Sequence, residues 1–79
     1  MLARVYVTLK PGVLDPAGKA VEGGLHSLGY SEVSQVRLGK YIELQVEGAD
    51  PAQARARVEE MCRKLLANTV VESYRVEVG

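Results

Sequence analysis

Cys62 and His26 are the only cysteine and the only histidine in this 79-residue sequence, and they could supply a nucleophile and a general base. Together they would suit thiol-based acyl transfer, in which the histidine takes the proton of the cysteine. Cys62 follows Met61, a core position of an expected helix, and nothing around it indicates an activated thiolate. We therefore predict no catalytic residue on this chain. A single cysteine also excludes an internal disulfide and a thiolate metal site.

Lys10-Pro11-Gly12 is the segment most similar to a phosphate-binding loop. It lacks the spacing of a P-loop and does not lead a glycine-rich turn directly into a helix. Asp15 and Asp50 could act as acids or bases, but each directly precedes a proline. Asp-Pro is typical of a helix start, where the carboxylate accepts from free N–H groups. We expect a shaped turn and two capped helices here, with no cofactor or metal on this chain.

The elements that position these residues follow from hydrophobic periodicity. Alternation of apolar and polar residues, or a β-branched run, predicts strands over residues 3–9, 33–38, 41–47 and 70–78. Apolar residues at helical spacing predict helices from Pro16 to about Leu28 and from Pro51 to about Ala67, the second with Leu65 in its apolar stripe. Gly29 and Asn68 are the expected left-handed terminators. Gly39-Lys40 has the length of a tight hairpin turn.

This order predicts an α+β fold of βαββαβ type in a single domain, residues 1–79. The two halves, each with Asp-Pro-Ala at its helix start, suggest a four-stranded antiparallel sheet with both helices on one face, related to the ferredoxin-like arrangement. The uncovered face would carry Tyr6 and Tyr41. In so small a domain we expect that face, or the sheet edges, to form a homodimer or tetramer. An RNA-stacking platform is the alternative.

Composition restricts the function classes further. Ten basic and ten acidic residues cancel, so attraction to nucleic acid or to an anionic membrane is not supported. Aromatic residues are only 5% of the chain, which argues mildly against an aromatic-walled cofactor pocket. No apolar stretch approaches 18 residues. We expect a cytoplasmic protein.

Three blocks of sequence are more specific. They are Leu9-Lys10-Pro11-Gly12-Val13-Leu14-Asp15-Pro16-Ala17-Gly18, then Val36-Arg37-Leu38-Gly39-Lys40-Tyr41-Ile42-Glu43-Leu44, then Met61-Cys62-Arg63-Lys64-Leu65-Leu66-Ala67-Asn68 followed by Val71-Glu72 and Tyr74. In this order and spacing they resemble the PurS family over essentially the whole chain. Thr69, where the family usually has proline, and Ser73, where an acidic or amide residue is usual, depart from its pattern.

The resemblance implies an accessory subunit of phosphoribosylformylglycinamidine synthase, a ligase of purine biosynthesis. PurS would bridge the glutaminase subunit (PurQ) and the synthetase subunit (PurL) and support ammonia transfer between them. The partner subunits would use ATP, Mg²⁺ and glutamine. The alternative is a ferredoxin-like ligand-sensing or RNA-binding module.

Contacts with those partners are expected on polar or glycine residues beside structural breaks, because a rigid scaffold presents binding groups there. The candidate residues are Lys10, Gly12, Arg37, Lys40 and Asn68.

Overall fold

Three antiparallel strands form the sheet in the computed structural model, which describes all 79 residues. The elements follow the order β1 (Leu2–Leu9), α1 (Pro16–Ser27), β2 (Gly39–Gln45), α2 (Pro51–Met61), a π-helical turn η1 (Cys62–Leu66) and β3 (Glu72–Val78). The sheet order is β2-β1-β3, so the first strand is central. Tyr6 lies opposite Tyr41 of β2 and Arg75 of β3. The predicted α+β class is confirmed.

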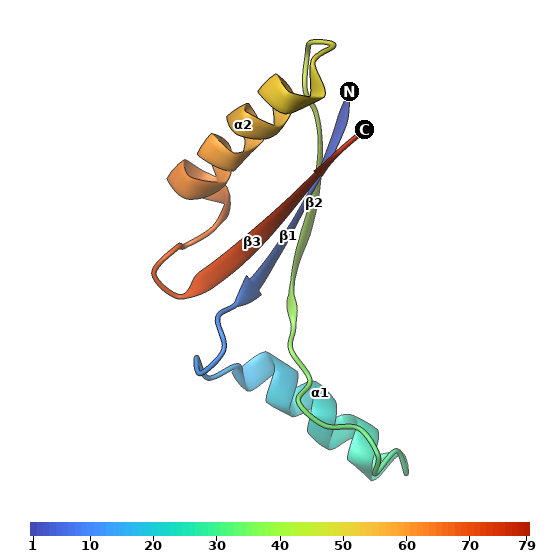
Figure 1. Ribbon diagram of the computed structural model, residues 1–79. Helices are drawn as coiled ribbons and strands as arrows, with labels where there is room; N and C mark the ends of the chain where they lie inside the picture. Colours follow the sequence, from blue (N-terminus) through green and yellow to red (C-terminus); the bar gives the residue numbers. More distant parts are fainter.

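A small apolar core lies between one face of the sheet and α2 (Figure 1). Alternate residues of β1 point into it, as the period of two predicts. Val58 and Cys62, one helical turn apart, cover them from the helix side. The buried residues of this cluster are Ala3, Val5, Val7, Val58, Cys62, Ala67 and Val76.

The four-stranded sheet and the Gly39-Lys40 hairpin were wrong predictions. Residues 33–38 form no strand, and Gly39 and Lys40 instead begin β2, opposite Thr8 and Val7. The physical reason is that side chains of the α1 region take the backbone N–H groups that a hairpin ladder would need. Asp15 accepts from Leu38 N (2.8 Å), and Glu22 of α1 accepts from Val36 N (3.1 Å). Residues 33–38 therefore follow α1, whereas a hairpin would place them against β2.

Only α2 packs on the sheet, so the expectation of two helices on one face was also wrong. Helix α1 extends beyond one end of the strands, at the opposite end of the molecule from the two chain termini (Figure 1). The molecule measures 48 × 24 × 14 Å, and its radius of gyration is 15.7 Å. A compact chain of this length would have a radius of about 12 Å. The α1 arm, residues 16–38, accounts for the elongated shape.

Both helices begin as predicted, but the second ends differently. Asp15 Oδ1 accepts from Gly18 N (2.9 Å), and Asp50 Oδ1 accepts from Ala52 N (3.1 Å). The wider π-helical turn shifts the helical periodicity, so that Leu65 is 84% exposed and does not continue the apolar stripe. Asn68 does not have the expected left-handed backbone, whereas Gly29 does (φ 100°). No helix is long and apolar enough to cross a membrane.

Candidate partner-binding end of the sheet

The five residues predicted to contact partners gather at one end of the sheet, although they come from three separate stretches of sequence. The link between the turns is a hydrogen bond from Lys10 N to Val71 O (2.8 Å). It places the turn at residues 10–14 beside the turn at residues 68–71. The structure therefore makes one surface of these residues, and their role as partner contacts stays a prediction.

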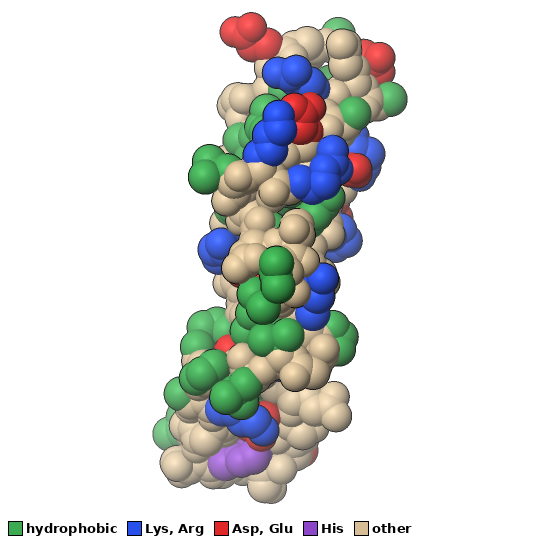
Figure 2. Space-filling view, turned by 90° about the vertical axis from the view of Figure 1, so that its left-hand side faces the viewer, with side chains coloured by type: hydrophobic (Ala, Val, Ile, Leu, Met, Phe, Trp, Pro, Cys, Tyr) green, Lys and Arg blue, Asp and Glu red, His purple; other side chains and the backbone are tan.

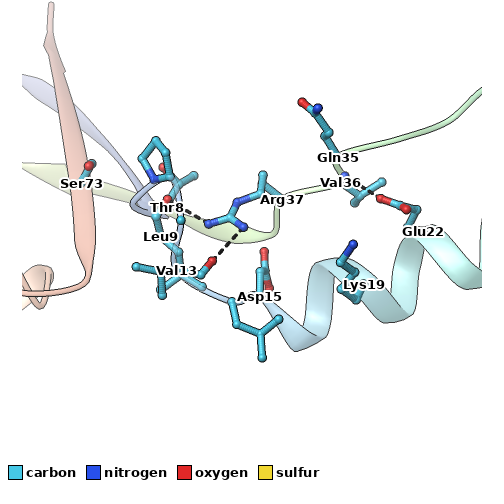
Figure 3. A pocket seen from close by; sticks show the side chains of 13 residues that line it. Thr8, Leu9, Val13, Asp15, Lys19, Glu22, Gln35, Val36, Arg37 and Ser73 are labelled. Atoms are coloured by element: carbon cyan, nitrogen blue, oxygen red, sulfur yellow. Dashed lines mark hydrogen bonds between the residues drawn. The ribbon is translucent and has the colours of Figure 1, made fainter.

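Arg37 fastens the first turn to the α1 arm. Its Nη1 donates to Val13 O (3.0 Å), and its Nη2 donates to Lys10 O (3.0 Å) and Leu9 O (3.3 Å), as Figure 3 shows in part. From the sequence, a turn had no evident need of a cation. This turn uses one, because two of its carbonyl groups and that of the last residue of β1 converge on the guanidinium. Three hydrogen bonds from the Nη atoms of Arg37 are thus made within the chain.

Asp15 forms a second contact between the start of α1 and the residues that lead into β2, and we call this contact the junction. Its side chain is only 5% exposed and accepts from both Gly18 N and Leu38 N. These two N–H groups, together with the nearby Arg37 cation, hold the pKa of the carboxyl below its usual range. Gly18 is required here, because a Cβ would collide with Val36 O and with the Asp15 carboxylate. The aspartate therefore joins the start of α1 to the start of β2.

Lys40 and Asn68 stabilise the second turn. Asn68 Oδ1 accepts from Val70 N (3.2 Å), and Asn68 N donates to Glu72 Oε1 (2.7 Å). Lys40 reaches across from β2, where its Nζ donates to Leu66 O (3.3 Å) and lies 4.0 Å from Glu72 Oε2. Like Arg37, these two residues have a structural contact that their positions in the sequence did not show.

A cavity of about 790 Å³ opens between the first turn, α1 and residues 35–37 (Figure 3). Leu9, Val13 and Val36 give it apolar lining, and Thr8 and Ser73 contribute hydroxyl groups. Lys19 rises from α1 toward residues 35–37 in Figure 3, and the sequence gave no indication that it lines a cavity. Gln35, at its rim, has φ 54°, a conformation that non-glycine residues seldom adopt.

The open face of the sheet carries Tyr6 and Tyr41, as expected, in an ordered polar network. Their ring centroids lie 5.1 Å apart, and the Arg75 guanidinium lies 4.1 Å above the centre of the Tyr6 ring. Tyr6 donates to Glu77 (2.9 Å), and Tyr41 donates to Glu43 (3.0 Å). The Glu77 hydrogen bond raises the pKa of Tyr6, and desolvation raises that of Tyr41. Glu43 and Glu77 balance the cations of Arg4 and Arg75 near these rings, so this face has no basic excess to attract a nucleic acid phosphate backbone.

Cys62 and His26 lie in different parts of the molecule. Cys62 is completely buried under the sheet, and desolvation raises the pKa of its thiol. His26 is exposed on α1, where its Nε2 is 2.6 Å from Val33 O. The structure does not bring them together as a nucleophile and base.

Comparison with known proteins gives one consistent result. Residues 2–79 match the family model described as PurS, phosphoribosylformylglycinamidine (FGAM) synthase. The Synechocystis protein named phosphoribosylformylglycinamidine synthase subunit PurS is 60% identical over 75 residues, which are 95% of this chain and 75% of that protein.

Two solved structures are similar over almost the whole chain. Bacillus subtilis PurS has a TM-score of 0.86 and 55% identity, covering 99% of this chain and 96% of that one. The PurLQS structure from Thermotoga maritima has a matching chain with a TM-score of 0.83 and 35% identity, covering 98% of this chain and 96% of that one.

Proposed function

The chain belongs to the PurS family, and from that premise we propose that it is the small accessory subunit of phosphoribosylformylglycinamidine synthase in purine biosynthesis. The family match over residues 2–79 carries this proposal. It favours the ligase subunit over the ligand-sensing and RNA-binding alternatives, which rested on fold analogy alone.

In the proposed complex, this chain bridges a glutaminase subunit and a synthetase subunit and supports ammonia transfer between them. The PurLQS structure from Thermotoga maritima contains a chain similar to this one, which supports the association. ATP, Mg²⁺ and glutamine would be used by the partner subunits. The burial of Cys62 and its distance in the fold from His26 are consistent with an accessory role. The proposed compartment is the cytoplasm.

We further propose that the chain acts as a homo-oligomer. A compact monomer of this mass would expose on the order of 4,700 Å², whereas this chain exposes 5492 Å². Part of the excess is the apolar side of the α1 arm, where Val21 and Leu28 are exposed and no strand of this chain covers them. A second copy would bury that surface. Tyr6 and Tyr41 on the open sheet face stay a second predicted interface.

The test is reconstitution with the glutaminase and synthetase subunits from the same organism. We expect glutamine-dependent formation of the amidine to require this chain. Turnover with ammonium chloride as the nitrogen source should depend on it much less, because free ammonia needs no transfer between subunits. Equal glutamine-dependent rates with and without the chain would contradict the proposed function.

A further inference from the structure

The sheet has two edges, and contacts within the chain protect only the edge formed by β3. Arg55 of α2 reaches this edge, where its Nη1 donates to Val76 O (2.6 Å). At the start of the strand, Glu72 N donates to Asn68 O (2.7 Å). Figure 2, which views the molecule from the side of α2 and β3, shows charged side chains over the half that contains α2. Such contacts and charges hinder pairing of an edge strand with another chain.

The outer edge of β2 has no comparable protection. Met1 N donates to Val46 O (2.6 Å), and Val46 N donates to Met1 O (2.9 Å), so this pair exchanges both backbone hydrogen bonds. In an antiparallel ladder such pairs alternate with pairs that exchange none. By this alternation, Tyr41, Glu43 and Gln45 direct their N–H and C=O groups away from β1, and no other group of the chain bonds to them.

The unpaired edge continues into the residues that precede β2. Side chains of the α1 region take the N–H groups of Leu38 and Val36. Arg37 lies between them, and its backbone N–H and C=O groups bond to no group of the chain. Because residues 36–38 lead directly into β2 (Figure 1), the free groups form one edge over residues 37–45, which we call the open edge.

The cations beside the open edge are directed into their own chain. The guanidinium of Arg37 donates to carbonyl groups at the end of β1 and in the first turn, and Lys40 Nζ donates to Leu66 O. Neither side chain therefore covers the open edge in the way that an outward lysine protects an edge strand.

A second copy of the chain is the occupant that suits the open edge. A two-fold axis places two identical edges antiparallel to one another, so each copy supplies the backbone partners that the other lacks. An axis one or two residues before Glu43 brings Leu38 of one copy, which is 49% exposed, opposite Val46 or Leu44 of the other. An axis at Glu43 itself would place two carboxylates opposite each other, which is unfavourable.

We propose that the open edge pairs with the open edge of a second copy, so that two three-stranded sheets join into one continuous antiparallel sheet. This deepens the self-association proposed above, on which it rests, by naming the strand that carries it. It also gives a role to the strand-like alternation of residues 36–38, because they would pair between copies instead of within one chain.

Amide hydrogen exchange of the original chain, followed by nuclear magnetic resonance, tests the pairing directly. We expect the N–H groups of Tyr41 and Glu43 to exchange roughly 10-fold to 100-fold more slowly than those of Tyr74 and Val78. The latter two are the matched comparison, because they point outward from β3 by the same alternation and have no hydrogen-bond partner.

Sedimentation equilibrium of two Glu43 variants tests the pairing a second time. Proline lacks the N–H group and is accepted on an edge strand where that group faces away from the sheet. Glu43→Pro should therefore weaken self-association by at least about 10-fold, because each of the two copies loses a donor. Glu43→Gln keeps the N–H group and should associate within about two-fold of the original chain. Circular dichroism should show the same secondary structure for both variants, and hydrogen exchange decides if Glu43→Pro does not fold.

Fast exchange of Tyr41 and Glu43 in the associated chain would overturn the proposal, as would equal self-association of the two folded Glu43 variants. Slow exchange of Tyr74 and Val78 instead would place the interface on β3. Slow exchange of Tyr41 and Glu43 only after addition of the glutaminase or synthetase subunit would assign the open edge to a partner strand, against the proposal. If the original chain is a monomer, self-association itself fails, whereas the role in the synthase is still decided by reconstitution.

Discussion

Replacing Val58 with alanine should destabilise the chain strongly, because this residue is the centre of the contact between α2 and the sheet. Its side chain is completely buried. Removal of two methyl groups costs about 1.6 kcal/mol in lost transfer free energy, and the cavity left behind adds about 1 kcal/mol. Alanine returns about 0.5 kcal/mol through its higher helix propensity. The net loss in free energy of unfolding is therefore about 2 kcal/mol.

For a domain of this size, 1 kcal/mol corresponds to a change of about 4–8 °C in the thermal midpoint, so Val58→Ala should melt roughly 8–16 °C lower. The assay is circular dichroism at one fixed chain concentration, because self-association would make the midpoint depend on concentration. Val70→Ala removes the same atoms from a side chain that is 80% exposed, and its midpoint should fall by less than about 4 °C.

Equal midpoints for the two valine variants would refute the packing of α2 on the sheet. The consequence would extend to the binding surface, since α2 and η1 lead directly into the turn at residues 68–71. Relative to the original chain, the destabilised Val58→Ala chain should also activate the synthase less well at 37 °C than at 20 °C.

Three further predictions concern the site. The lowered pKa of Asp15 means that its stabilising contribution is complete above the ordinary carboxyl pKa of about 3.9 and is lost as the pH falls below that value. Thermal melts of Asp15→Asn between pH 3 and 6 should therefore show a weaker pH dependence than those of the original chain. Identical profiles would count against the junction. Tyr6→Glu should weaken self-association if the open sheet face is an interface, because it places an unpaired charge there; sedimentation equilibrium with an unchanged oligomer would exclude that face. Lys40→Ala should lower the thermal midpoint of the free chain by less than about 4 °C, while more of it is needed for half-maximal glutamine-dependent activity; activation equal to the original chain would show that this exposed cation only stabilises the turn at residues 68–71.

The strands and helix starts could largely be predicted from the sequence, since they depend on local information. Alternation of apolar and polar residues identified β1 within one residue, and the two Asp-Pro pairs located the starts of both helices. Inward and outward positions followed as well, so Tyr6 and Tyr41 were correctly placed on the open face. The PurS resemblance, carried by three ordered blocks, identified the family from the sequence alone.

The tertiary structure determined the conformation of those residues whose local preferences compete with contacts to residues distant in the sequence. Residues 33–38 have the alternation of a strand, yet Asp15 and Glu22 take the N–H groups of Leu38 and Val36, so these residues follow α1. Leu65 has the spacing of a core residue, yet one π-helical turn places it in solvent.

The assembly of the binding surface also depended on long-range contacts. The pairing of β1 with β3, which the hydrogen bond from Lys10 N to Val71 O continues, brings two turns about 60 residues apart in the chain to one place. Because such contacts join residues with no fixed spacing in sequence, periodicity could predict the elements but not the surface that they build.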